Sequence, residues 1–136
     1  MTFIKPYIIR LSHCDATGYV FYPHYFHIFN ALMEDWFYEG LEIPFHSFLF
    51  DRGLALPTVK LECTFLAPTK MGETVDFWLT VTHMGRSSLR LTQGVAKDGE
   101  DRVRFTRIVV CTSQLTGKSV QIPPDLREAV DKFTRV

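Results

Sequence analysis

Residues 23–40 read PHYFHIFNALMEDWFYEG and predict one long helix whose surface is apolar over most of its circumference. Apolar side chains recur at helical spacing in two adjacent stripes: Tyr25, Ile28, Phe29, Leu32 and Trp36 in one, and Phe26, Met33 and Phe37 in the other. Pro23 suits the first helical position, and Gly40 is expected to end the helix. Only a narrow face is less apolar, formed by His27, Asn30, Ala31, Glu34 and Asp35. Such a helix needs a broad apolar cover, such as a sheet.

The rest of the chain supplies that sheet. Apolar residues with a period of two predict four strands, at residues 54–65, 75–81, 89–95 and 103–111, and residues 4–11 are a plausible fifth strand. Turn residues at 68–72, 84–88 and 98–101 separate the strands at hairpin spacing and predict antiparallel neighbours. A short tail helix is expected after Pro124. The layout is α+β, a curved antiparallel sheet of about five strands around one central helix, which is the hotdog arrangement.

Length and composition limit the class of protein. A chain of 136 residues with 46% hydrophobic residues predicts one domain over residues 1–136. Fifteen basic residues balance fifteen acidic ones, so nucleic-acid and membrane partners are not expected. Without a signal peptide or an apolar stretch of ~18 residues, the sequence predicts a cytoplasmic protein. The three cysteines fit neither a disulfide framework nor a zinc site and are expected to be reduced and mostly buried.

The segment before the helix carries the candidate chemistry. Residues 10–25 read RLSHCDATGYVFYPHY and place a single carboxylate, Asp15, in a loop ahead of the Gly18 bend. Hydrolysis of a thioester needs a group that polarises the carbonyl oxygen and a carboxylate or activated water that attacks the carbon. A helix N-terminus provides free N–H groups for the oxygen, here the amides of Tyr22, His24 and Tyr25. The alternative is that Asp15 only caps a turn.

These residues resemble the signature of the 4-hydroxybenzoyl-CoA thioesterase family, C-D-x-x-G-x-V-x-x-P-x-Y. The matching positions are Cys14, Asp15, Gly18, Val20, Pro23 and Tyr25. Residues 65–75, FLAPTKMGETV, are similar to the family's F-x-x-P-x-x-x-G-D-x-V turn, with Glu73 in place of Asp. The resemblance implies that Asp15 is the nucleophile or general base and that the Tyr22 amide binds the thioester oxygen, with Gly18, His24 and Tyr25 beside the substrate. It also implies a homotetramer built from dimers, with no metal or redox cofactor.

The resemblance further assigns the coenzyme A grip to the hairpin at residues 84–89, which here contains Arg86, Ser87 and Ser88. One guanidinium with two hydroxyls can bind a phosphate through bidentate, charge-assisted hydrogen bonds. Family members can place more positive charge at this hairpin, which leaves open looser binding of coenzyme A or an acyl group presented by a carrier protein. The alternative is an ordinary solvated hairpin.

Several other patterns invite a functional interpretation. His13, Cys14 and Asp15 are adjacent and point to opposite sides of an extended chain, so they do not form a triad. His24 and His27 have a spacing that can share a metal, but no carboxylate stands at a companion position. Glu34 and Asp35 are an alternative catalytic site on the helix, although a polar stripe is the preferred interpretation. An apolar cluster, formed by Phe45, Phe48, Leu49 and Phe50, is expected to cover the core rather than wall an acyl pocket.

The sequence therefore predicts an acyl-CoA thioesterase that hydrolyses an aryl or short-chain acyl-CoA to the free acid and CoA. Its partner is the acyl-CoA substrate. Two other functions stay open, namely a thioesterase for acyl-carrier-protein thioesters and a non-catalytic acyl-thioester binding protein, because a fold alone does not establish activity. A hotdog dehydratase is a weaker alternative, since no motif for the required His and carboxylate pair is apparent.

Overall fold

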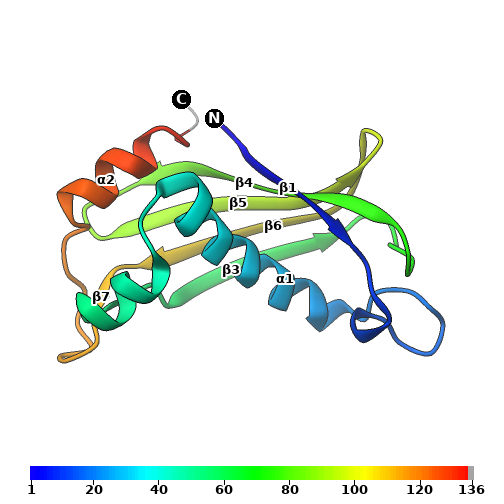
Figure 1. The fold of residues 1–136 in the computed structure, drawn as a ribbon, viewed down its shortest axis with the longest axis horizontal. Coiled ribbons are helices and arrows are strands. Elements are labelled where there is room, and N and C mark those ends of the chain that lie inside the picture. Colours follow the sequence, from blue (N-terminus) through cyan, green and yellow to red (C-terminus); the bar gives the residue numbers. More distant parts are fainter. Residues whose placement is uncertain (135–136) are drawn as a thin grey trace.

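The computed structural model describes residues 1–134 and consists of a curved sheet with one long helix against its concave side (Figure 1). The sheet contains five strands in the order β1-β4-β5-β6-β3, with every neighbouring pair antiparallel. These strands are β1 (Phe3–Ile8), β3 (Thr58–Phe65), β4 (Thr74–Met84), β5 (Ser88–Lys97) and β6 (Glu100–Val110). A small two-stranded sheet pairs β2 (Leu54–Ala55) with β7 (Thr112–Ser113). The α+β fold expected from the sequence is confirmed.

The helical elements follow the apolar pattern of the sequence. Helix α1 spans Tyr22–Asp35 and continues directly into a wider turn of helix, η2 (Trp36–Leu41). Short helical turns occur at η1 (Leu11–His13) and η3 (Ser47–Asp51), and the tail helix α2 spans Pro124–Asp131. Within residues 1–134, no helix combines the length and apolar character needed to cross a membrane.

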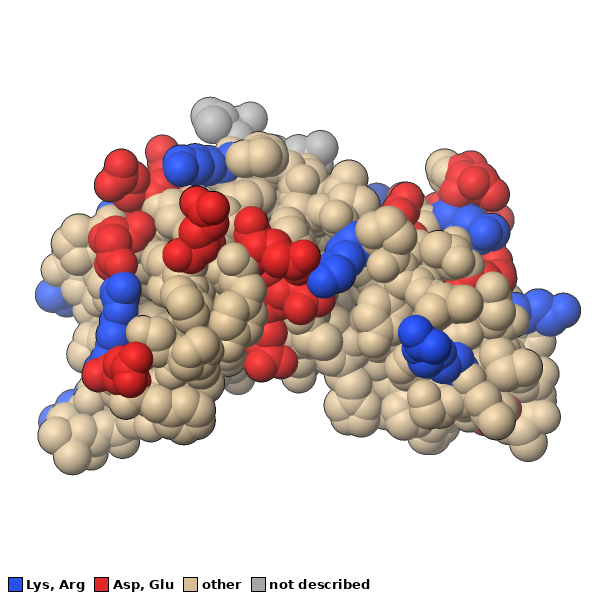
Figure 2. Space-filling model, in the orientation of Figure 1, with Lys and Arg blue, Asp and Glu red and all other residues tan. Residues whose placement is uncertain are grey.

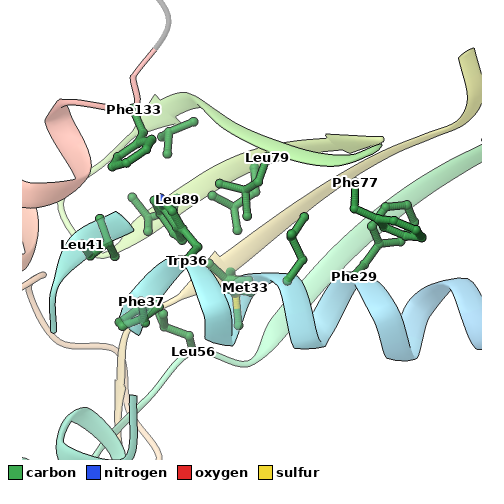
Figure 3. Packing of buried hydrophobic residues seen from close by; sticks show 14 of the residues in the cluster. Phe29, Met33, Trp36, Phe37, Leu41, Leu56, Phe77, Leu79, Leu89 and Phe133 are labelled. Carbon is green, nitrogen blue, oxygen red and sulfur yellow. The ribbon is translucent and has the colours of Figure 1, made fainter. Parts of the chain in front are cut away.

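The core lies between α1 and the sheet. Figure 3 shows side chains of α1 and η2 directed at the sheet, where Phe29 lies against Phe77 and Trp36 lies close to Leu89. Phe29 also stacks on Phe105 of β6, with ring centroids 4.8 Å apart. The residues of both apolar stripes are buried except Phe26, which is partly buried. Burial of these large side chains removes apolar surface from water over most of the helix circumference, which is the main force that holds the sheet around it.

Gly40 does not end the helix as the sequence predicted. The helical turn continues to Leu41 and ends where Glu42 adopts a left-handed conformation, with φ of 58°. Gly40 is required for packing instead, because a Cβ there would lie 2.7 Å from Cδ1 of Trp36 and 3.1 Å from Cζ of Phe133. The glycine therefore allows the indole of Trp36 to fit against the end of the helix.

Two sheet features differ from the sequence prediction. The strand predicted over residues 54–65 is broken at Leu56 and Pro57 into β2 and β3, which belong to different sheets, because proline cannot donate to the strand ladder. The turn at residues 68–72 does not join neighbouring strands, since β3 pairs with β6 and not with β4. As a result β3 lies at the edge of the sheet, with most of its residues exposed.

The expectation of reduced, mostly buried thiols holds in part. All three cysteines are free, but only Cys111 is fully buried, whereas Cys14 and Cys63 are partly exposed.

The turn at residues 68–73 is held by an ion pair with β6. Arg102 donates to Glu73 through two hydrogen bonds of 3.2 and 3.0 Å, and to the carbonyl oxygen of Pro68 at 2.9 Å. Glu73 also accepts a hydrogen bond from the Lys70 amide at 2.7 Å. Hydrogen bonding to Arg102, and then to Lys70, holds the pKa of Glu73 below its ordinary value of 4.5. The same turn is hydrogen-bonded through its backbone to the loop that carries Asp15.

Replacing Glu73 by Gln should lower the free energy of unfolding by about 1–2 kcal/mol at neutral pH, because the buttressing hydrogen bonds become neutral or are lost. Since the pKa of Glu73 is depressed in the folded state, its contribution is present above the ordinary value of 4.5 and is lost as the pH falls through the depressed pKa. Urea unfolding of both proteins across the acid range measures this. The exposed Glu62→Gln is the control. An equal loss of unfolding free energy in both variants would contradict a stabilising role of Glu73 in this turn.

Candidate active site

Residues 13–21 form a tight hairpin in front of α1. Cys14 and Val20 pair as an antiparallel bridge, and the Asp15 amide donates to the carbonyl oxygen of Tyr19 at 3.0 Å. The turn closes with a hydrogen bond of 3.1 Å from the Gly18 amide to the Asp15 carbonyl oxygen. Gly18 has a φ of 82°, which favours glycine because a Cβ is strained in this conformation. The predicted Gly18 bend is therefore present and fixes the position of Asp15.

The hairpin is hydrogen-bonded both to the turn at residues 68–73 and to the start of α1. The Val20 amide donates to the carbonyl oxygen of Thr69 at 3.0 Å, and the Met71 amide donates to that of Gly18 at 2.9 Å. On the helix side, the Phe21 amide donates to the His13 carbonyl oxygen at 2.9 Å. Asp15 and the start of α1 therefore lie at the same end of the molecule in one hydrogen-bonded unit.

The carboxylate of Asp15 is exposed and carries its own set of donors. Its Oδ1 accepts a hydrogen bond of 2.8 Å from the Thr17 amide and a second one from the Thr17 hydroxyl. These bonds, the hydroxyl first, hold the pKa of Asp15 below its ordinary value of 3.8. The turn-capping role considered from the sequence is thus present. It uses only Oδ1, and within residues 1–134 Oδ2 accepts no hydrogen bond, so an ionised oxygen stays open to a ligand.

The N-terminus of α1 leaves one candidate amide clearly open. Helical residues begin at Tyr22, after Phe21 in an extended conformation. The His24 amide donates to the Phe21 carbonyl oxygen at 2.9 Å, so the prediction of His24 as a free donor is wrong. Across residues 1–134 the Tyr22 amide donates to no other group, and the positive end of the helix dipole reinforces it. Tyr22 is therefore the amide best suited to bind a carbonyl oxygen.

An apolar groove of about 310 Å³ opens beside Tyr22. Its lining residues are Tyr22, Tyr25, Phe65, Leu66, Ala67 and Pro68. The ring of Phe65 lies 6.1 Å from that of Tyr22 and 5.9 Å from that of Tyr25. The groove lies between the start of α1 and the end of β3, and its aromatic walls suit a flat acyl group.

The predicted phosphate-binding residues do not lie near Asp15 in the same chain. Arg86, Ser87 and Ser88 occupy the β4–β5 hairpin, whereas the Asp15 loop follows β1 at the start of β4. The 11 residues of β4 separate the two sites, which is roughly 33 Å at the rise of a β-strand. Figure 1 shows the hairpin beside α2 and the Asp15 loop at the far end of the sheet. Arg86 is exposed, while its carbonyl oxygen accepts a hydrogen bond from the Ile122 amide.

The remaining histidine and cysteine candidates have structural partners. The Cys14 thiol donates to the Arg10 carbonyl oxygen at 3.4 Å, and burial followed by the Asp15 charge raises its pKa, which does not favour a nucleophile. Nδ1 of His24 lies 3.3 Å from Nδ1 of His27. Across residues 1–134, no three His, Cys, Asp or Glu side chains gather as a metal site.

The alternative carboxylates on the helix lie away from the groove. Glu34 is exposed, and Asp35 lies 3.2 Å from Nζ of Lys5. Both therefore fit the polar stripe that the sequence favoured. In the apolar cluster at residues 45–50, Phe48 is fully buried and its ring packs 5.4 Å from that of Phe37, as expected for a core residue, whereas Phe50 is 79% exposed.

Residues 9–130 match the sequence pattern of the thioesterase-like superfamily, which covers most of the chain. The chain belongs to the thioesterase-like superfamily. The predictions of a thioester hydrolase and of the hotdog fold are confirmed at this level. The narrower resemblance, to 4-hydroxybenzoyl-CoA thioesterases, is confirmed only as membership of the superfamily.

Relatives of this thioesterase-like chain include enzymes named for aryl-CoA substrates. A 1,4-dihydroxy-2-naphthoyl-CoA hydrolase from Synechococcus elongatus is 26% identical over 122 residues, which are 89% of each chain. A 1,4-dihydroxy-2-naphthoyl-CoA thioesterase from Synechocystis shares the fold with a TM-score of 0.87 and 20% identity, over 96% of both chains. A gentisyl-coenzyme A thioesterase has a TM-score of 0.82 and 24% identity, over 93% of this chain and 98% of its own.

Thr17 is the site residue of this thioesterase-like chain that the sequence analysis missed. Its hydroxyl and amide both donate to Asp15, and an Asp side chain that accepts from the backbone amide two residues later is a known turn pattern. Arg102 was missed as well, because a charged residue in an alternating strand gives no sign of its distant partner Glu73.

Replacing Thr17 by Val should raise the pKa of Asp15 toward 3.8, because the hydroxyl that stabilises the carboxylate most is removed while the amide remains. As the pH falls, any reaction that needs ionised Asp15 should then lose its activity at a higher pH in the variant than in the wild type. Titration of the Asp15 carboxyl carbon by NMR measures the shift, with the exposed Thr64→Val as control. An Asp15 pKa that is unchanged in Thr17→Val would contradict the assigned hydrogen bonding.

Proposed function

We propose that this chain hydrolyses an aryl or short-chain acyl-CoA thioester to the free acid and CoA, with Asp15 as nucleophile or general base. The observation that carries the proposal is the open Tyr22 amide at the N-terminus of α1, in one hydrogen-bonded unit with an ionised Asp15 and beside an apolar groove. The groove supplies the acyl site, the amide supplies an oxygen-binding donor, and Asp15 supplies a carboxylate.

The mechanism begins when the thioester carbonyl oxygen accepts a hydrogen bond from the Tyr22 amide. Negative charge that develops on this oxygen is stabilised by the amide and by the helix dipole. Asp15 then acts in one of two ways. As a nucleophile it attacks the carbonyl carbon, expels the CoA thiolate and forms an anhydride that water hydrolyses; as a general base it removes a proton from an attacking water.

An aryl acyl group is the substrate class that the groove supports best. Tyr22, Tyr25 and Phe65 provide flat apolar walls, which pack well against an aromatic ring. The relatives named as 1,4-dihydroxy-2-naphthoyl-CoA and gentisyl-CoA enzymes act on aryl thioesters by their names, which supports the same class here. A short-chain acyl group would also fit a groove of about 310 Å³.

Binding of coenzyme A by Arg86, Ser87 and Ser88 requires a second copy of the chain, since these residues lie far from Asp15. The exposed edge of β3 is suited to pair with itself, because an unpaired edge presents free backbone groups. Figure 2 shows a hollow between two lobes, at the place where Figure 1 has the β3 edge. Antiparallel pairing there would place the hairpin end of one sheet beside the Asp15 end of the other. We propose such dimers, paired again into a tetramer, in the cytoplasm.

Two alternatives use the same groove. A thioester on a carrier protein would need fewer contacts to phosphate groups than acyl-CoA does. The hairpin at residues 84–89 has Arg86 as its single basic residue, which favours the carrier-protein substrate. A non-catalytic acyl-thioester binding protein would bind the ligand without turnover. Thiol release from acyl-CoA and from acyl-carrier protein separates these functions.

Asp15→Asn should lower kcat for aryl-CoA hydrolysis by a factor of about 100 or more, because the amide keeps the shape but neither attacks the carbonyl nor removes a proton efficiently. Free-thiol release from aryl, short-chain and long-chain acyl-CoAs measures the rates. Glu34→Gln is the matched control and should stay near wild type. Loss of activity in Glu34→Gln with an active Asp15→Asn would move the site to the helix.

The role of the Tyr22 amide can be tested by removing only its N–H. Proline is tolerated in the first turn of a helix, and Phe21 already has the extended conformation favoured before proline, so Tyr22→Pro should fold. We expect kcat to fall about 100-fold or more relative to Tyr22→Ala, which loses the same ring but keeps the amide. Equal kcat values in the two variants would contradict an oxygen-binding role of this amide.

A further inference from the structure

Three segments at the Asp15 end of the molecule are joined side by side through their backbones. They are residues 9–11, 13–21 and 69–72. Tyr19 and Lys70 form an antiparallel bridge between two of these segments. The third segment follows β1 and is attached by the Gly72 amide, which donates to the Ile9 carbonyl oxygen at 2.8 Å. The three segments therefore form one continuous surface in front of α1.

The outer face of this surface carries the Asp15 carboxylate. The Asp15 amide donates to Tyr19, which is bridged to Lys70, and residues opposite each other on paired segments point to the same face. The positions between them point inward, since Thr69 is buried and Val20 packs against the core. Asp15, Tyr19 and Lys70 are all exposed. They lie in one row, with neighbours about 5 Å apart at the spacing of paired strands.

The outer face also carries two cations without acidic partners. Arg10 and Lys70 are exposed, and within residues 1–134 neither forms an ion pair. Asp15 is the only acidic residue in the three segments. Glu73, which follows them, is partly buried and paired with Arg102 at 3.0 Å. The face therefore offers its positive charge to an anionic partner.

Large apolar side chains lie beside these cations. Leu11 is 69% exposed and Met71 is 51% exposed. The ring of Tyr19 is also exposed, and Nζ of Lys70 lies 5.8 Å from its centroid. Exposed apolar residues that gather on one surface mark a site of contact with another molecule. We refer to the five residues Arg10, Leu11, Tyr19, Lys70 and Met71 as the Arg10–Lys70 patch.

The proposed pairing of β3 edges leaves the Arg10–Lys70 patch uncovered. Arg10 and Leu11 follow β1, which is the edge of the sheet opposite β3. In Figure 2 the lobe at the lower right, where Figure 1 has the Asp15 loop, is mostly tan and carries a blue group. The whole chain has no net charge, so a second copy brings no excess of acidic groups to the patch. An acidic protein does, and its charge is complementary.

We infer that the Arg10–Lys70 patch is the docking surface for an acidic carrier protein, which presents the acyl group as a thioester on its pantetheine arm. The inference rests on the proposed hydrolysis at Asp15 and adds a second carrier of the same thioester beside CoA. Acidic side chains of the carrier pair with Arg10 and Lys70, while its apolar side chains cover Leu11 and Met71. Because Lys70 lies about 10 Å from Asp15 along the exposed row, the arm of a docked carrier reaches the carboxylate.

The test compares the same acyl group on three carriers. Benzoyl and butyryl thioesters are prepared on an acidic fatty-acid acyl carrier protein, on CoA and on uncharged pantetheine. In the double variant Arg10→Glu, Lys70→Glu, kcat/KM for the carrier-protein thioesters should fall about tenfold or more, because like charges then oppose association. For acyl-pantetheine it should stay within about twofold of wild type, and for acyl-CoA it should fall less than about threefold.

The matched control is Lys118→Glu, Lys132→Glu, which changes the net charge equally at exposed positions in the β7 turn and after α2. It should leave all three substrates within about twofold of wild type. An equal loss for acyl-CoA and the carrier-protein thioesters in the patch variant would overturn the inference, since the patch would then bind nucleotide phosphates. An equal loss for all substrates with dissociation of the oligomer in sedimentation would also overturn it, in favour of a second copy.

A second variant covers the case in which the charge reversal fails to fold. Arg10→Ala, Lys70→Ala removes both charges without adding repulsion. Its ratio of kcat/KM for the carrier-protein thioester over acyl-pantetheine should fall about threefold or more. The ratio should also depend less on the KCl concentration than in the wild type, because the screened ion pairs are gone. Wild-type ratios and an unchanged salt dependence in this variant would refute the docking role.

Failure of the hydrolysis proposal can be recognised separately. If the wild type releases no thiol from any of the three substrates, binding of the carrier protein itself becomes the readout, by NMR titration of the isotope-labelled chain. Chemical-shift changes at the Arg10–Lys70 patch that disappear in the charge-reversed variant support docking without turnover. Hydrolysis of acyl-CoA and acyl-pantetheine without hydrolysis of the carrier-protein thioester would overturn the docking and leave the hydrolysis proposal intact.

Discussion

The rest of the structure depends on the burial of a helix that is apolar on most of its sides. Helix α1 and its continuation η2 bury Tyr25, Phe29, Trp36 and Phe37, so a sheet must curve around them to remove this surface from water. The same constraint leaves the N-terminus of the helix at one end of the sheet. The Tyr22 amide is therefore left open at that end, and the narrow polar stripe of the helix is exposed or partly exposed.

Support for Asp15 comes from outside its own loop. Arg102 on β6 holds Glu73 and Pro68, the neighbouring residue Thr69 binds the hairpin through its backbone, and the hairpin positions the carboxylate. This support places Asp15 at the end of the molecule that lies far from Arg86. A site that needs both groups would therefore require two copies of the chain, as in the dimer that we propose.

Much of this structure could be predicted from the sequence, because its signals are periodic or local. The apolar stripes of α1, most of the alternating strands and the Gly18 bend depend on neighbouring residues only, and they were identified correctly. The strand predicted over residues 54–65 is the exception, since it is broken at Leu56 and Pro57. Features that depend on distant contacts were not identified. Gly40 looked like a helix end, but it is needed because Trp36 and Phe133 pack against it. The pairing of β3 with β6 and the hydrogen bond that Arg107 of β6 donates to Asn30 of α1 also join residues far apart in the sequence, which no local pattern reveals.

Mixing two inactive chains tests most directly whether the site is assembled from opposite ends of two copies. One chain carries Asp15→Asn, and the other carries Arg86→Ala, Ser87→Ala and Ser88→Ala; the two are unfolded together, refolded and assayed for thiol release from an aryl-CoA. Each chain alone should be nearly inactive, whereas the mixture should recover about a quarter of the wild-type rate, because half of the dimers are mixed and each has one intact site. A mixture no more active than the separate chains would contradict a site shared between copies.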